Sequence, residues 1–120
     1  MRRLSVLGLT QHQQLFDDTF VTGVGRDVFR EADVIVGLHP DEATEVIVDL
    51  AIKYDKPFAV VPCCVFPTMF PGRVGRDGEE VRSHAQFCDY LEDKHEGVMR
   101  VELEELMKPA NVVLYYKPKG

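Results

Sequence analysis

The clearest pattern of hydrophobic and polar positions lies between residues 33 and 66. The almost unbroken apolar run of residues 33–38 (DVIVGL) predicts a strand covered on both faces, as in parallel sheets. Residues 58–61 (FAVV) predict a second strand. Between them, apolar side chains recur at helical spacing, at Ala43, Val46, Ile47, Leu50, Ala51 and Tyr54. Strand, helix and strand with short joints predict a right-handed parallel crossover.

The segments before this unit have weaker patterns. Residues 4–9 (LSVLGL) predict a short first strand. The polar stretch after it predicts a long connection with a helical turn near residues 13–16, anchored by Phe16 and Phe20. Residues 27–32 predict a further helical turn that leads into the strand at residue 33.

After residue 66, prolines and glycines predict a surface loop to residue 78, with Phe66, Met69 and Phe70 as its apolar anchors. Residues 83–94 predict a helix, whose buried side chains would be Phe87, Tyr90 and Leu91. Residues 98–103 and 112–116, joined by a short turn, predict an antiparallel strand pair at one edge. We therefore predict one α/β domain over residues 1–120: a small three-layer mixed sheet with a parallel βαβ core and an antiparallel carboxyl-terminal strand pair.

Composition narrows the classes of partner. The net charge of −6 argues against nucleic acid held by bulk electrostatics, although a local basic patch at Arg73, Arg76 and Arg82 stays open. No apolar run reaches the roughly 20 residues of a membrane-spanning helix, so we expect no membrane partner. Three cysteines cannot all pair within one chain, which favours a reducing compartment, and we expect a cytoplasmic protein.

The candidate functional residues lie in the turns that come after the two strands of the crossover. His39-Pro40-Asp41 comes directly after the first strand, and Pro62-Cys63-Cys64 comes after the second. Ligands of open parallel sheets bind outside the carboxyl ends of the strands, so we expect these side chains to line one rim. Each also has a structural interpretation: Asp41 as a helix cap, the cysteines as small buried side chains, and His39 as a loop residue.

Two segments of the sequence partly match known functional motifs but lack essential residues of each. The His-Pro-Asp and Pro-Cys-Cys turns approach the signature of zinc deaminases, but the two-residue spacer between the thiols is missing. Adjacent cysteines on an extended backbone point in opposite directions, so we predict no metal ligand. Gly23-Val24-Gly25 lacks both the third glycine and the preceding strand of a dinucleotide-binding turn.

The LHPDEAT turn and the later PCC turn together resemble the Rossmann-like, S-adenosylmethionine-dependent methyltransferase superfamily, and more distantly its tRNA ribose methyltransferases. The resemblance covers residues 33–117 and implies the carboxyl-terminal half of that fold, a truncated Rossmann-like sheet. Its fourth and fifth strands would be residues 33–38 and 58–61, and the last two strands would be its antiparallel sixth and seventh.

The resemblance also implies roles for the rim. S-adenosylmethionine would be the cofactor, with His39 and Asp41 as catalytic residues and Gly37, Leu38, Cys63 and Cys64 as cofactor-binding residues. Because the family's glycine-rich turn has no counterpart here, methyl transfer to an acceptor such as RNA would need a partner chain or a second copy. The alternative is a non-catalytic binding or structural module, which would form a homodimer.

Overall fold

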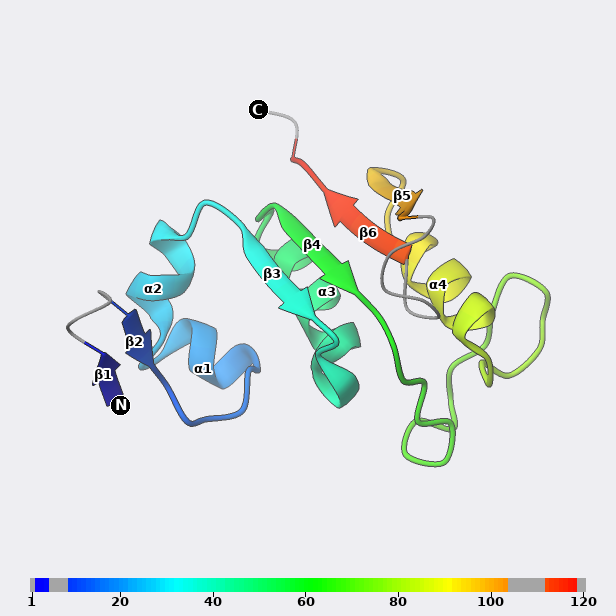
Figure 1. The fold of residues 1–120 in the computed structure, drawn as a ribbon, viewed down its shortest axis with the longest axis horizontal. Coiled ribbons are helices and arrows are strands. Elements are labelled where there is room, and N and C mark those ends of the chain that lie inside the picture. Colours follow the sequence, from blue (N-terminus) through cyan, green and yellow to red (C-terminus); the bar gives the residue numbers. More distant parts are fainter. Residues whose placement is uncertain (1, 5–8, 104–111, 119–120) are drawn as a thin grey trace. The chain divides into compact units, whose positions relative to one another are not determined.

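The computed structural model describes residues 2–4, 9–103 and 112–118, and the chain divides into two compact units, Met1–Glu31 and Ala32–Gly120 (Figure 1). No helix among the described residues is long and apolar enough to cross a membrane. The boundary of a single domain over residues 1–120 stays a prediction.

The first unit begins with a hairpin of β1 (Arg2–Leu4) and β2 (Leu9–Gln11). Leu4 pairs with Leu9 across this hairpin, so the prediction of one strand from residue 4 to residue 9 is wrong. A short apolar run has the same composition whether it forms one strand or crosses from one strand to the next, and this explains the error.

Two short helices complete the first unit, α1 (Asp18–Thr22) and α2 (Arg26–Glu31). The helical turn predicted near residues 13–16 is wrong, because Asp17 caps α1 by accepting a 2.8 Å hydrogen bond from the Phe20 amide. The turn predicted at residues 27–32 is confirmed as α2. Phe16 lies 6.1 Å from the rings of both Phe20 and Phe29, which makes the small apolar cluster of this unit.

The second unit holds a four-stranded mixed sheet (Figure 1). Its strands are β3 (Ile35–Leu38), β4 (Phe58–Val61), β5 (Val98–Glu102) and β6 (Val112–Tyr116), in the order β3-β4-β6-β5. Only the pair β3 and β4 is parallel, and the other pairs are antiparallel. This confirms the predicted α/β class, and the mixed sheet is consistent with a truncated Rossmann-like fold.

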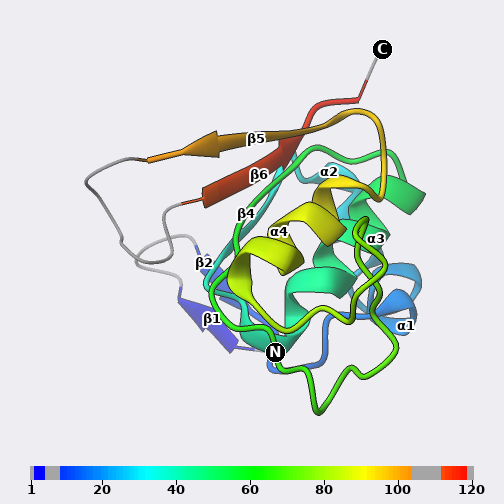
Figure 2. The same cartoon turned by 90° about the vertical axis from the view of Figure 1, so that its right-hand side faces the viewer.

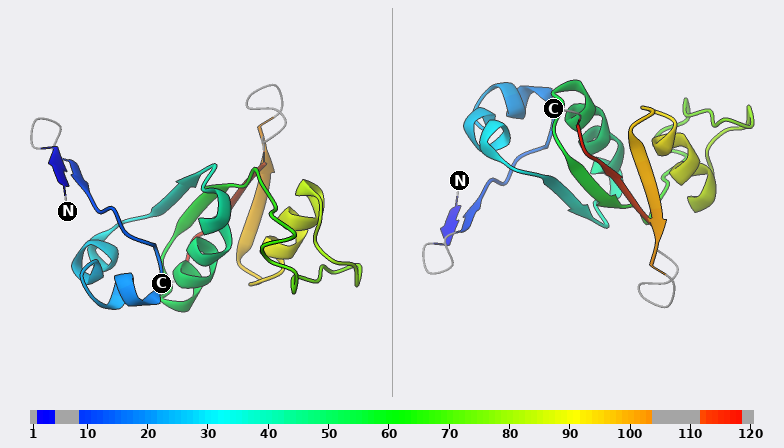
Figure 3. Two further views of the ribbon diagram at one scale, coloured as in Figure 1. Left: turned by 90° about the horizontal axis from the view of Figure 1, so that it is seen from below. Right: turned by 90° about the horizontal axis from the view of Figure 1, so that it is seen from above.

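Two main helices, α3 (Thr44–Lys53) and α4 (His84–Glu92), cover the same face of this sheet (Figures 2 and 3). A Cβ atom at Gly37 of β3 would lie 3.0 Å from Ile47 of α3, and Arg100 of β5 donates a 2.8 Å hydrogen bond to Asp89 of α4. Pairing across the strands places Gly37 and Arg100 on one face. The core between helices and sheet includes Ile47, Val48, Leu50, Ala51, Phe58, Val60, Phe87, Cys88, Leu91, Val98, Leu114 and Tyr116.

The opposite face of the sheet carries apolar side chains that remain exposed. Val36 of β3 is 67% exposed and Leu38 is 63% exposed, while Met99 and Val101 of β5 and Tyr115 of β6 are also exposed. The expected third layer is therefore missing from the described part of the second unit, and the prediction that β3 is covered on both faces is wrong there. The apolar run in β3 gives the strand two apolar faces. No described element of this unit covers the face that carries Val36 and Leu38.

Candidate functional site

The two chemistry-bearing turns lie side by side at one rim of the sheet. Leu38 and Val61, the last residues of β3 and β4, are register partners in the parallel ladder. The His39 amide continues the ladder by donating a 3.1 Å hydrogen bond to the Val61 carbonyl oxygen. The prediction that the turns meet is confirmed, because parallel strands bring their carboxyl ends to the same edge.

The side chains of Asp41, Cys63 and Cys64 converge at this rim. The Cys63 Sγ lies 3.5 Å from the Asp41 Oδ1 and 3.6 Å from the Cys64 Sγ. The prediction that the two cysteines point in opposite directions is wrong, because β4 ends at Val61 and the following turn is no longer extended strand. Cys63 is half-buried and Cys64 is exposed, so neither is a core side chain.

Asp41 does not cap the helix. A short 3-10 helix, η1 (Asp41–Ala43), precedes α3, and neither shows a side-chain hydrogen bond at its cap. Instead, the Thr44 hydroxyl donates to the Asp41 carbonyl oxygen at 2.7 Å, and the Asp41 carboxylate accepts from Cys63. The structural interpretation of Asp41 is therefore wrong, and its carboxylate belongs to the rim.

Three non-glycine residues around the rim have left-handed backbones, His39 (φ 51°), Asp41 (φ 55°) and Phe66 (φ 53°). Histidine and aspartate tolerate this conformation better than most residues, whereas for phenylalanine it is unusual. Each such residue costs about 1–3 kcal/mol and persists only where the surroundings hold it. The turns are thus fixed in their present arrangement by the contacts around them.

The chemistry of the thiols follows from their neighbours. Partial burial, together with Cys64 and Asp41 beside it, raises the pKa of the Cys63 thiol to about 11. Cys63 is therefore protonated at neutral pH and is not an activated nucleophile, since thiolate is the reactive form. Cys88, by contrast, is fully buried on α4, which confirms the prediction that it belongs to the core.

The expected cofactor-binding residues of β3 lie on different faces. Gly37 is buried toward α3, where the side chains of Ile47, Pro40 and Val60 leave no room for a Cβ atom without adjustment. Leu38 points to the exposed apolar face of the sheet. Their roles in cofactor binding, like those of Cys63 and Cys64, stay predictions.

Sequence reasoning missed the residues that hold the cysteine turn in place. His84 of α4, expected only at the helix edge, places its Nε2 3.1 Å from the Pro62 carbonyl oxygen. Arg73 is only 5% exposed and donates to the Val65 carbonyl oxygen at 3.0 Å and to Glu45 at 2.6 Å. These contacts join residues far apart in the chain, and no local pattern signals them.

Glu45 is the centre of this supporting network. Burial opposes its ionisation, but hydrogen bonds from Lys94, Tyr90 and Arg73 outweigh burial and lower its pKa. The Arg73 guanidinium also lies 3.9 Å from the ring centre of Phe70. Arg73 and Phe70 therefore hold the loop after β4 against the helices, whereas Met69, an expected anchor, is 57% exposed.

The basic patch that the sequence left open does not form. Arg73 is buried against Glu45. Arg76 contacts Asp89, Glu92 and Asp93, and Arg82 contacts Glu80. Carboxylates thus neutralise all three guanidinium groups, and this part of the surface offers no excess positive charge to a phosphate backbone.

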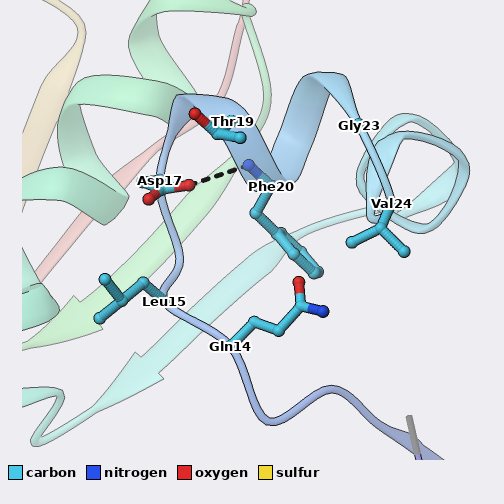
Figure 4. Close-up of a pocket in the computed structure, with 7 residues that line it drawn as sticks. All are labelled: Gln14, Leu15, Asp17, Thr19, Phe20, Gly23 and Val24. Atoms are coloured by element: carbon cyan, nitrogen blue, oxygen red, sulfur yellow. Dashed lines mark hydrogen bonds between the residues drawn. The ribbon is translucent and has the colours of Figure 1, made fainter.

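A separate pocket in the first unit has little chemistry of its own (Figure 4). Its polar carboxylate, Asp17, is engaged in capping α1. Gly23-Val24-Gly25 stands between two helices and follows no strand, so the rejection of a dinucleotide-binding turn is confirmed. The residues lining the pocket are Gln14, Leu15, Asp17, Thr19, Phe20, Gly23 and Val24.

Comparison with known proteins finds a distant relative. The chain is 26% identical over 95 residues to a human protein named probable tRNA (uracil-O(2)-)-methyltransferase, and the match covers 78% of this chain. It spans only 12% of the length of that protein. No protein-family model matches the chain, and no solved structure does. The similarity supports a distant methyltransferase-like relationship.

Proposed function

We propose that the chain is part of a methyltransferase-like domain that transfers methyl groups from S-adenosylmethionine to RNA together with a partner polypeptide. The observation that carries the proposal is the convergence of the Asp41, Cys63 and Cys64 side chains at the carboxyl ends of β3 and β4, where the His39 backbone continues the ladder. Open parallel sheets bind their ligands at this position. The distant likeness to a protein named as a tRNA methyltransferase supports the same reaction class.

The residues present fit the cofactor only in part. The rim offers polar side chains beside an exposed surface, but the described residues contain no glycine-rich turn directly after a strand. Bound S-adenosylmethionine would supply an electrophilic methyl group. The His39 imidazole or the Asp41 carboxylate would hold the proton that a ribose hydroxyl gives up, and the strained turns would fix the position of that hydroxyl.

The open sheet supports the need for a partner. β3 is the terminal strand of the described sheet, so one of its edges can accept another strand. The adjoining exposed side chains Val36 and Leu38 form apolar surface of the kind that marks interfaces. A partner that adds a strand beside β3 would cover this surface and bring further residues to the rim.

Calorimetric titration with S-adenosylmethionine tests the proposal in two stages. The chain alone should give no heat at millimolar cofactor, and heat from the chain alone would remove the requirement for a partner. The complex with its native partner should bind the cofactor and methylate RNA, and Asp41→Asn and His39→Ala should lower the methylation rate. A stable native complex that never binds the cofactor would overturn the proposed enzyme.

The exposed apolar face also favours a second candidate, a non-catalytic binding module that forms a homodimer through this face. Solution mass distinguishes the two candidates. The module should be a dimer that gives no heat with S-adenosylmethionine in any complex, whereas the enzyme candidate requires a different polypeptide on the same surface.

A further inference from the structure

The rim carries a set of atoms with the spacing of a metal site. The two thiol sulfurs of Cys63 and Cys64 and a carboxylate oxygen of Asp41 all lie within 4.8 Å of one another. They come from two turns that are far apart in sequence and are brought together by the parallel pairing of β3 and β4. All three residues are at least partly exposed, so a cation can reach them from solvent.

Two of the measured separations match the edges of a tetrahedral coordination sphere. With Zn–S bonds of about 2.3 Å, two sulfurs on one tetrahedral zinc ion stand about 3.8 Å apart. With a Zn–O bond of about 2.1 Å, sulfur and oxygen stand about 3.6 Å apart. The observed distances are 3.6 Å between the sulfurs and 3.5 Å between Cys63 Sγ and Asp41 Oδ1.

Hydrogen bonding in this cluster is weak. A thiol has a single proton, so Cys63 cannot donate to Asp41 and to Cys64 at the same time. The remaining contact would need Cys64 to donate to the Cys63 sulfur, a weak acceptor. One cation bound by both sulfurs and the carboxylate would use all three groups as ligands.

We propose that Asp41, Cys63 and Cys64 bind a thiophilic divalent cation of the Zn²⁺ class, with a fourth coordination position open to water. Two soft sulfur ligands select zinc-like ions over magnesium or calcium. On binding, both thiols lose their protons to solvent and each sulfur forms a bond to the metal, while no group changes oxidation state. The ion would link the turn after β3 to the turn after β4, whether or not the chain takes part in methyl transfer.

Titration of the reduced protein with Co²⁺ tests the site, because cobalt bound to thiolates gives a charge-transfer absorption that water-bound cobalt lacks. The full chain should bind one equivalent, and Zn²⁺ should displace the cobalt. Since binding occurs only in the folded state, Zn²⁺ should also raise the Tm by several degrees.

Single substitutions test which residues bind the metal ion. Cys64→Ser should lower the affinity by more than about 100-fold, beyond the 10–100-fold typical of groups that only support a ligand. Cys63→Ser and Asp41→Asn should each weaken binding as well. The matched control is Cys88→Ala, since Cys88 lies on α4 outside the cluster and should leave the affinity unchanged.

Cys64 is exposed, so its replacement by serine should leave the fold intact, which circular dichroism will check. Absence of the charge-transfer band in the wild-type chain at submillimolar cobalt would overturn the proposal. Equal loss of affinity in Cys64→Ser and Cys88→Ala would overturn it too. Calorimetry with S-adenosylmethionine reports on a different ligand, so failure of the proposed enzyme and failure of this metal site are separate outcomes.

Discussion

At the scale of single residues, the rim depends on side chains whose neighbours change their chemistry. The sequence predicts Asp41 as a helix cap, but its carboxylate accepts a hydrogen bond from Cys63. The sequence supplies the residue types, but the partner of Asp41 depends on the pairing of β3 with β4. A local pattern therefore identifies the candidates correctly and misassigns the contacts between them.

The Cys63 thiol provides a prediction about reactivity. Because Asp41 contributes to the raised pKa of Cys63, Asp41→Asn should lower that pKa and increase the thiolate fraction. Alkylation of Cys63 by iodoacetamide in the presence of a chelator should then accelerate, by about three- to fourfold for each pKa unit recovered, because the larger thiolate fraction is partly offset by lower nucleophilicity. Peptide mass spectrometry will measure the rate. An unchanged rate would show that Asp41 has no electrostatic influence on the thiol, and buried Cys88 serves as the slow internal reference.

Glu45 provides a prediction about pH. Its carboxylate has a pKa below the usual 4.5 when folded, so the unfolded chain binds more protons in acid. The stabilisation is complete above the usual pKa and is lost as pH falls through the folded pKa. Urea unfolding should therefore show stability falling below about pH 4.5 with a slope of at most about 1.4 kcal/mol per pH unit from this group. Glu45→Gln should remove that part of the slope.

A matched substitution at an exposed carboxylate supplies the control for this pH dependence. Glu96→Gln changes a side chain at the protein surface outside the Glu45 network and should leave the slope as in the wild type. If Glu45→Gln and the wild type lose stability in parallel between pH 6 and pH 3, the network around Glu45 does not stabilise its ionised form.

At the scale of elements, sequence patterns succeeded where the period was long and unambiguous. The helices α3 and α4 and the strands β3 to β6 lie where the periodicity predicted them, and β6 matches residue for residue. The prediction at Leu4 to Leu9 is wrong because a short apolar run has the same composition in a strand and in a hairpin. The prediction at Gln13 to Phe16 is wrong because the helix begins after its cap residue, Asp17. Non-local ion pairs such as Arg73 with Glu45 leave no periodic signal.

The packing of α3 on β3 gives a prediction about Gly37. A Cβ atom there would crowd Ile47 of α3, Pro40 of the turn and Val60 of β4, at 3.0 Å, 3.2 Å and 3.3 Å. Three side chains would each have to shift by a few tenths of an ångström in a packed core, so Gly37→Ala should destabilise the fold by about 1–3 kcal/mol. Gly72→Ala is the matched control because nothing lies within 4 Å of its added atom. Equal urea midpoints for both variants would contradict the close packing at Gly37.

At the scale of the whole molecule, the main feature is a sheet with one covered and one exposed face in the unit Ala32–Gly120. An exposed apolar face beside a free strand edge promotes association. The sequence predicted that β3 is apolar on both sides, but it could not reveal that no described element of this unit covers the second side. That information belongs to the arrangement of elements and cannot be read from the period of any one of them.

The exposed face predicts association that single charges will disrupt. Leu38→Lys places a cation on the exposed apolar face at the end of β3, so it should weaken self-association or binding of a native partner by about tenfold or more, because a charge desolvated without a counter-ion opposes docking. Because Leu38 is 63% exposed, the free energy of unfolding should change by less than about 1 kcal/mol. Analytical ultracentrifugation over a range of concentrations will measure association, and urea unfolding will measure stability.

Leu15→Lys, at an 82% exposed leucine in the other unit, is the control and should leave association unchanged. If Leu38→Lys and Leu15→Lys associate as the wild type does, the apolar sheet face is not an interface.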